Sequence, residues 1–255
     1  MTLPSFSLAG RTALVTGAAR GLGRAIALAL AQSGADVALG LRDRANDGGL
    51  VAEIEKIGRK ALPLQMDVMD LQQSYAAADE AIAAFGHLDI LVNNAGGGTD
   101  GPIEDFPEEE FDWTVDFVVK STFFISQHVG RHMIARKSGA IINMGSQAGA
   151  IALPGEAIYC LSKAAVSHMT KCFAIEWGKH NVRVNCVAPT FFRTDGTAEA
   201  LGNPAFRADV IERIAGLHRI GEPHEVADAV AFLASDAAGM ITGHTLLIDG
   251  GWTAR

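Results

Sequence analysis

Short apolar segments alternate with helix-like segments along this whole chain. Seven segments are short, apolar and poor in charge: residues 12–16, 36–41, 61–66, 90–93, 140–144, 183–187 and 245–248. Six segments between them have helical character: residues 21–33, 50–57, 72–84, 108–136, 159–180 and 223–234. Uncharged runs of this kind are typical of strands in a parallel sheet covered on both faces by helices. The pattern predicts an α/β fold with a doubly wound, mostly parallel seven-stranded sheet.

The length of 255 residues suits one domain with a large core. No repeat, low-complexity segment or linker marks off a second unit, so residues 1–255 are expected to form a single domain. The one long stretch without clear periodicity is about residues 189–217. Because loops often carry binding residues, we expect this stretch to be the substrate loop.

Composition and charge argue against several classes of function. The formal net charge is −8 and no basic cluster is present, so nucleic-acid binding is not expected. No apolar run approaches the roughly 20 residues that span a bilayer, and residues 1–7 lack the features of a targeting signal. The three cysteines are odd in number and lack metal-ligand spacing. We expect a cytoplasmic protein with reduced thiols and no metal, nucleic-acid or membrane association.

A glycine-rich turn separates the first predicted strand from the first predicted helix. Residues 17–23 read GAARGLG, which places glycines at Gly17, Gly21 and Gly23. Glycines let a backbone turn tightly and approach a pyrophosphate, which amides at a helix N-terminus can then bind. Glycine turns before helices also occur for packing alone. The segment is therefore a candidate nucleotide site.

Tyr159 and Lys163 are a candidate acid/base pair in the predicted helix of residues 159–180. Side chains four residues apart project from one face of a helix, so the Lys163 ammonium could stabilise an ionised Tyr159. A free phenol has a pKa near ~10, and we expect Lys163 to lower the pKa of Tyr159. Ser146 lies thirteen residues earlier and adds a hydroxyl for a substrate oxygen. An interfacial tyrosine beside a solvated lysine is the structural alternative.

Taken together, these segments resemble the short-chain dehydrogenases/reductases over essentially the whole chain. The resemblance implies a Rossmann fold, an NAD(P) cofactor and hydride transfer between the nicotinamide and a secondary alcohol or ketone carbon. It gives catalytic roles to Ser146, Tyr159 and Lys163. The implied cofactor-binding residues are Gly17, Arg20, Gly21, Leu22, Gly23, Arg42, Asp67, Val68, Asn94, Ala95, Gly96, Tyr159, Lys163, Pro189 and Thr194. Residues 249–251, Asp-Gly-Gly, match a C-terminal signature.

The resemblance also bears on the choice between NADP and NAD. NAD-preferring members carry an acidic residue at the end of the second strand, where this chain has Leu41. Arg42 and Arg20 could flank a ribose 2′-phosphate with charge-assisted hydrogen bonds. Asp43 could instead present a carboxylate to the ribose. NADP is thus the expected cofactor, and NAD stays possible.

Two positions depart from the family pattern. Val118 stands where the family usually has a catalytic asparagine, and Thr190 replaces the glycine of Pro-Gly. Valine cannot hold a relay water by its side chain. The alternative to an efficient enzyme is therefore a catalytically weak nucleotide-binding or cofactor-sensing protein. At Thr190 we expect a different backbone geometry near the nicotinamide.

The substrate and the assembly are also expectations from the resemblance. The sequences of residues 106–110, 132–139 and 249–252 look similar to those of sugar and sugar-acid dehydrogenases, and 3-oxoacyl carrier-protein reductases share most of these sequence features. Arg193 could pair with a substrate carboxylate, and Phe191 with Phe192 suggests an apolar wall.

Helices 108–136 and 159–180 carry more apolar residues than one face requires. A homotetramer is therefore expected.

Overall fold

Seven parallel strands form a single sheet within residues 5–254, the part of the chain that this computed structural model describes. The strands are β1 (Thr12–Thr16), β2 (Asp36–Leu41), β3 (Ala61–Gln65), β4 (Ile90–Asn93), β5 (Gly139–Met144), β6 (Val182–Pro189) and β7 (Thr245–Ile248). Their order across the sheet is β3-β2-β1-β4-β5-β6-β7. The predicted fold class and all seven predicted strands are confirmed. Residues 1–7 are predicted to lack a targeting signal, and this segment begins outside the described residues.

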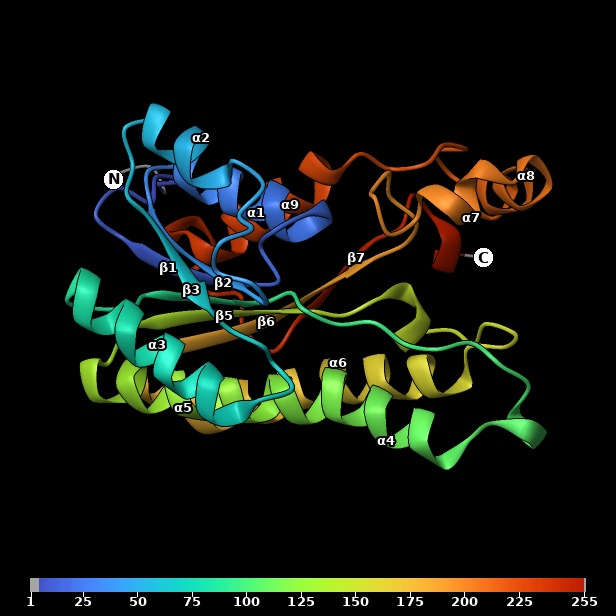
Figure 1. Ribbon diagram of the computed structural model, residues 1–255, viewed down its shortest axis with the longest axis horizontal. Coiled ribbons are helices and arrows are strands. Elements are labelled where there is room, and N and C mark those ends of the chain that lie inside the picture. Colours follow the sequence, from blue (N-terminus) through green and yellow to red (C-terminus); the bar gives the residue numbers. More distant parts are fainter. Residues whose placement is uncertain (1–4, 255) are drawn as a thin grey trace.

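Helices cover the sheet on both faces (Figure 1). One layer contains α1 (Gly21–Gln32), α2 (Leu50–Lys56) and α9 (Pro223–Ala234), and the other contains α3 (Leu71–Phe85), α4 (Glu108–Val115), α5 (Ser121–Arg136) and α6 (Ala157–Trp177). Successive strand residues point to opposite faces, so Val15 belongs to the core under the first layer and Leu14 to the core under the second. None of the described helices is both long and apolar enough to cross a membrane.

The helix predicted over residues 108–136 is interrupted. A π-helical turn, Asp116–Lys120, separates α4 from α5. A π turn inserts an extra residue into the helical repeat, and such insertions occur often at functional sites. Val118, the residue that stands in place of the family asparagine, lies in this turn and is buried.

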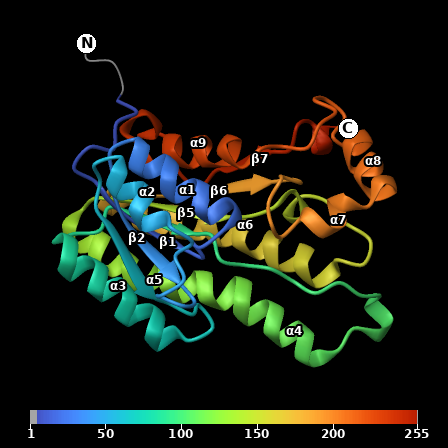
Figure 2. The same ribbon diagram turned by 45° about the horizontal axis from the view of Figure 1, so that its top comes forward.

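Residues 189–217 were predicted to lack regular structure, but part of this stretch is helical. It contains the short helices α7 (Ala198–Gly202) and α8 (Pro204–Arg213), which lie together at one end of the molecule (Figure 2). Asn203 caps α8, because its side-chain oxygen accepts hydrogen bonds from the amides of Ala205 and Phe206. A proline follows at the first helical position, an arrangement that favours helix initiation.

Parallel pairing places the carboxyl ends of all seven strands at one edge of the sheet. β1 lies between β2 and β4, so the chain order reverses between β1 and β4. Ligands of open α/β sheets bind outside the carboxyl ends of the strands at such a reversal. The glycine turn follows β1, and Asn94 follows β4. The topology therefore brings two of the predicted cofactor segments together.

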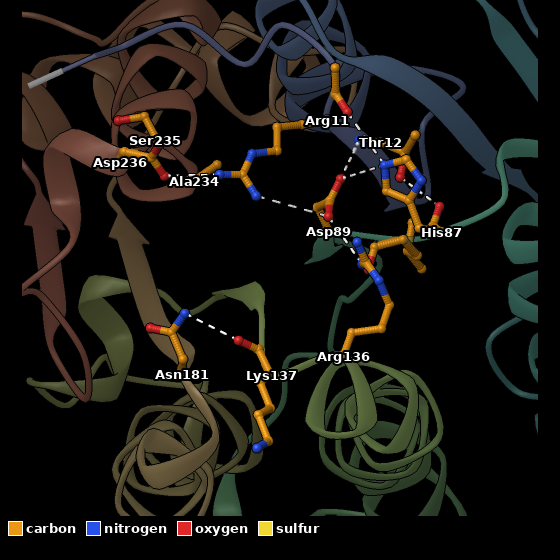
Figure 3. Close-up of polar contacts among 12 residues, drawn as sticks. Arg11, Thr12, His87, Asp89, Arg136, Lys137, Asn181, Ala234, Ser235 and Asp236 are labelled. Carbon is orange, nitrogen blue, oxygen red and sulfur yellow. Dashed lines mark hydrogen bonds and ion pairs between the residues drawn. The ribbon is translucent and has the colours of Figure 1, made fainter.

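The amino ends of the strands carry a buried ionic network centred on Asp89 (Figure 3). The Asp89 carboxylate is 4% exposed and accepts hydrogen bonds from the Thr12 amide at 3.0 Å and from Arg136 Nη1 at 3.1 Å. It also lies 3.1 Å from His87 Nε2 and 4.0 Å from Arg11 Nη1. The network joins the start of β1, the start of β4 and the end of α5. It lies at the edge of the sheet opposite the predicted site.

Candidate active site

The glycine turn after β1 forms an open cradle at the N-terminus of α1. Gly17 and Gly21 have φ of +65° and +57°, in the left-handed region that favours glycine. Arg20 precedes the helix without capping it by its side chain. The first amides of α1 therefore have no capping side chain, and they can bind an anion. The tight glycine turn and the uncapped amides at the start of α1 suit the pyrophosphate of a dinucleotide.

Asn94 holds this turn against the end of β4. Its side-chain amide donates to the carbonyls of Thr16 at 2.9 Å and Gly17 at 3.2 Å. The Thr16 hydroxyl in turn accepts from the amides of Asn94 and Ala95 at 2.9 and 3.0 Å. A side chain at Gly23 would collide with the Gly17 carbonyl and the Asn94 amide. The two cofactor segments thus form one rigid unit.

Of the residues predicted to contact the ribose, Arg42 and Asp43 follow β2, and Arg20 lies in the glycine turn before α1. Arg20 and Arg42 are both exposed, and neither makes an ion pair within residues 5–254. Asp43, the competing carboxylate, accepts a hydrogen bond from the Ala45 amide at 3.0 Å. That bond holds one of its oxygens in the local turn. Leu41 is fully buried, as expected for the end of a central strand.

The predicted adenine contacts follow β3. Asp67 accepts a hydrogen bond from the Met69 amide at 3.0 Å, which fixes its carboxylate at the sheet edge. Val68 lines a surface cavity of about 370 Å³ whose far side includes Asp116 and Lys120. The structure therefore places an acceptor and an apolar side chain next to each other at the edge that holds the glycine turn.

Ser146, Tyr159 and Lys163 come together at the carboxyl end of β5. Ser146 follows this strand, and its hydroxyl accepts from the Ala148 amide at 3.1 Å and lies close enough to Tyr159 to lower the pKa of the phenol. Lys163 lies one turn of α6 beyond Tyr159, with Nζ 5.6 Å from the centre of the tyrosine ring. Two glycines give the site room, since a Cβ at Gly98 would lie 2.9 Å from the Tyr159 ring and one at Gly149 would lie 2.8 Å from the Lys163 backbone. Sequence reasoning missed both glycines.

The pKa of Tyr159 moves in the direction opposite to the prediction. Burial raises the pKa of Tyr159 to about 12, and only the hydrogen bond with Ser146 acts in the opposite direction. Lys163 is not among the groups that lower the pKa of the phenol. Burial lowers the pKa of Lys163 itself to about 8, and its ammonium donates to the Met144 carbonyl at 2.8 Å. Proximity along the helix is therefore not the dominant electrostatic effect here.

Val118 lies near Lys163, since a Cβ on Gly96 would be 3.3 Å from Lys163 Nζ and 3.9 Å from Val118 Cγ2. It packs in a small apolar cluster with Val166 and Cys186, and all three are buried. Lys163 thus has an apolar wall on the side where the family asparagine would stand, and its hydrogen bond to Met144 remains. Met144 is a further residue of this site that the sequence did not reveal, because its contribution is a backbone carbonyl.

The segment after β6 closes over the glycine turn. Thr194 lies so close that a Cβ on Gly21 would be 3.6 Å from its own Cβ. Pro189 is the last residue of β6. Thr190 does not adopt a positive φ, so a threonine fits here without backbone strain. Arg193, predicted as a partner for a substrate carboxylate, instead donates to Glu222 at 2.8 Å.

Comparison with known proteins identifies the family. A family described as enoyl-(acyl carrier protein) reductase matches residues 17–253. The chain is 38% identical to the 2-dehydro-3-deoxy-D-gluconate 5-dehydrogenase of Escherichia coli K12, with all of both chains covered. It is 40% identical to the D-threitol dehydrogenase of Mycolicibacterium smegmatis, with 98% of this chain and 95% of the relative covered. The chain belongs to the short-chain dehydrogenase/reductase family.

A solved structure of similar sequence agrees with this assignment. The gluconate 5-dehydrogenase from Burkholderia cenocepacia J2315, solved in complex with NADP and tartrate, is 34% identical and superposes with a TM-score of 0.94. The match covers 99% of this chain and 98% of that one. The short-chain dehydrogenases/reductases act on CH–OH groups with NAD(P), and this chain is an oxidoreductase of that kind.

Proposed function

We propose that this protein is an NADP-dependent oxidoreductase that interconverts a secondary alcohol and a ketone on a sugar, a sugar acid or a 3-oxoacyl substrate. The observation that carries the proposal is the placement of Ser146 close enough to Tyr159 to lower the pKa of its phenol, with Lys163 one helical turn away. Relatives named for sugar acids and polyols support the substrate class. A panel of sugar acids, polyols and 3-oxoacyl thioesters, followed by the absorbance of the reduced nicotinamide, tests it.

The roles of the three residues follow from their protonation. With its pKa near 12, Tyr159 carries its proton at neutral pH and can donate it to the substrate oxygen in reduction. Ser146 holds that oxygen by a hydrogen bond. Lys163, with a pKa near 8, is mostly charged at neutral pH and can bind hydroxyl groups of the cofactor ribose. When bound, the nicotinamide supplies or accepts the hydride.

The cofactor is held by residues from four strand ends. Gly17, Gly21, Leu22 and Gly23 receive the pyrophosphate, and Asp67 with Val68 receives the adenine. Asn94, Ala95 and Gly96 follow β4, and Gly96 lies beside Lys163, since a Cβ on Gly96 would be 3.3 Å from Lys163 Nζ. Pro189 and Thr194 cover the nicotinamide end, and Lys163 also binds the ribose hydroxyls. The open cradle at the glycine turn is the observation that supports this assignment.

NADP is preferred over NAD in this proposal because Arg42 and Arg20 are exposed and unpaired in the described part of the chain. Replacing Arg42 with alanine is expected to weaken NADP binding by about 1 to 3 kcal/mol and to leave NAD binding nearly unchanged. Calorimetric titration with each cofactor measures both affinities. Arg44→Ala is the control, because Arg44 is already paired with Glu80. Equal losses for NADP and NAD would show that Arg42 does not bind the 2′-phosphate.

A homotetramer is supported by apolar side chains that one subunit leaves uncovered. Phe111 and Trp113 on α4, Phe123 on α5, and Leu161 and Ile175 on α6 are exposed, with Ile175 at 84%. These helices lie side by side (Figures 1 and 2). Other apolar residues of these helices, such as Ile125 and Phe173, are buried within the subunit. Two perpendicular isologous contacts would generate the tetramer.

Light scattering tests the assembly. We expect a mass about four times that of the 26.8 kDa chain. Ile175→Glu should reduce this mass, because it places a charge in the buried interface. A wild-type mass equal to that of one chain would contradict the tetramer.

The proposed cytoplasmic location is supported by the cysteines, all of which are free thiols.

Val118 supports the second candidate, a cofactor-binding protein with weak catalysis. It fills the position of the family asparagine with a buried apolar side chain. The same substrate panel distinguishes the two functions. NADP binding without turnover of any member of the panel would favour the cofactor-binding protein with weak catalysis.

A further inference from the structure

Two loops meet beside the Tyr159 ring. One follows β4 and the other precedes α6, and the Gly101 amide donates to the Gly155 carbonyl at 2.8 Å. Gly98 in the first loop lies directly on the Tyr159 ring, so close that a Cβ would be 2.9 Å from Cδ2. Each loop carries a carboxylate next to this junction: Asp100 in the first and Glu156 in the second. Both residues are therefore adjacent in the chain to the junction of the two loops beside Tyr159.

The two carboxylates form a negative field at the reacting hydroxyl. The charges of Glu156 and Asp100 both help to raise the pKa of Tyr159. Glu156 is half-buried, and burial together with the charge of Asp100 raises its own pKa. The three groups thus interact with one another across the two loops. A third negative charge, such as the carboxylate of a sugar acid, would be repelled at this place.

Two basic side chains that could offset this charge, Arg193 and Lys163, already have partners. Arg193, predicted as a partner for a substrate carboxylate, is paired with Glu222. Lys163 is buried and donates to the Met144 carbonyl. Carboxylates accept hydrogen bonds from hydroxyl groups, and such charge-assisted bonds are strong. A chain of uncharged hydroxyls therefore fits this field, whereas a sugar acid does not.

We propose that Asp100 and Glu156 determine substrate specificity by selecting uncharged polyhydroxylated substrates, polyols and neutral sugars, and rejecting those with a carboxylate. This inference rests on the proposed function of the Ser146, Tyr159 and Lys163 site and narrows its substrate class. The pair binds the hydroxyls next to the reacting carbon, while Tyr159 remains the proton donor.

Threitol and tartrate of matching configuration are suitable probes. They share a carbon skeleton and two secondary hydroxyls, and differ in ending in hydroxymethyl or carboxylate groups. Calorimetry on the NADP-bound protein at neutral pH measures their binding independently of turnover. Wild type should bind threitol at least about tenfold more tightly than tartrate. In the double variant Asp100→Asn with Glu156→Gln, tartrate should gain at least about tenfold and threitol should lose affinity.

The control makes the same charge change nearby. Glu104→Gln with Asp105→Asn alters two exposed carboxylates of the same loop region that do not act on the pKa of Tyr159. It should keep the wild-type preference. An equal shift in this control would overturn the proposal, because general charge rather than the pair would then be responsible.

The other outcomes separate this inference from the proposed function. Wild type that binds tartrate as tightly as threitol, or a preference that survives in the Asp100 and Glu156 variant, overturns the inference. If neither probe binds but a 3-oxoacyl thioester is reduced, the inference also fails while the proposed function stands. If no member of the substrate panel is turned over although NADP binds, the proposed function fails, and the inference fails with it.

Discussion

Replacing Tyr159 with phenylalanine is expected to reduce turnover by at least about 10² while NADP affinity changes little. Phenylalanine keeps the ring, and with it the packing against Gly98, but it removes the hydroxyl and its transferable proton. Initial rates with the best substrate of the panel and calorimetric titration with NADP measure the two quantities. A separate loss of NADP affinity would indicate a structural role for the hydroxyl.

The chain offers a matched control for this substitution, because it contains only two tyrosines. Tyr75 lies on α3, where its ring stacks on that of His128 with the ring centres 4.6 Å apart. Tyr75→Phe should leave turnover nearly unchanged. If Tyr159→Phe retained half of the wild-type rate, Tyr159 could not be the proton donor, and the proposed mechanism would be wrong.

Replacing Asp89 with asparagine is expected to lower the free energy of unfolding by about 2 kcal/mol. The asparagine can still accept from the Thr12 amide, but it leaves Arg136 and His87 without a carboxylate at a position that is 4% exposed. Breaking a fully buried ion pair costs about 3 to 5 kcal/mol. The smaller value is expected because the Arg136 and His87 side chains are each about a third exposed and therefore partly solvated.

Urea unfolding at fixed protein concentration measures this loss, since assembly makes stability depend on concentration. Asp236→Asn is the control. Asp236 also pairs with Arg11, at 3.1 Å, but its side chain is 70% exposed. Exposed pairs contribute roughly 0 to 1 kcal/mol, so this control should be nearly neutral. A similar loss in both variants would mean that burial of the Asp89 network does not account for its effect.

The fold could be predicted because its signals are local and repeated. Apolar runs such as 12–16 and 90–93 identify strands that are buried on both faces, and the alternation with helices requires parallel crossovers. Gly17 and Gly21 revealed the cradle because the left-handed backbone found there favours glycine. The four-residue spacing of Tyr159 and Lys163 placed them on one helix face.

Other features were not visible in the periodicity. The π turn at Asp116–Lys120 adds one residue between two helices that follow each other without a break, so no sequence signal marks it. The helices α7 and α8 are short, and much of their surface is exposed. Only the Asn203-Pro204 start of α8 gives a local signal, and that signal could have been recognised.

The sequence by itself determined the family, the sheet and the identity of the candidate residues, because these depend on residue types at short fixed spacings. The tertiary structure alone decided the electrostatics of the site. The pKa of Tyr159 rises because the fold buries it and brings Asp100 and Glu156 close, although 56 positions separate those two carboxylates in the chain. The pairing of Arg193 with Glu222 likewise joins distant segments. Burial and long-range charge depend on distances in space, which spacing along the chain does not specify.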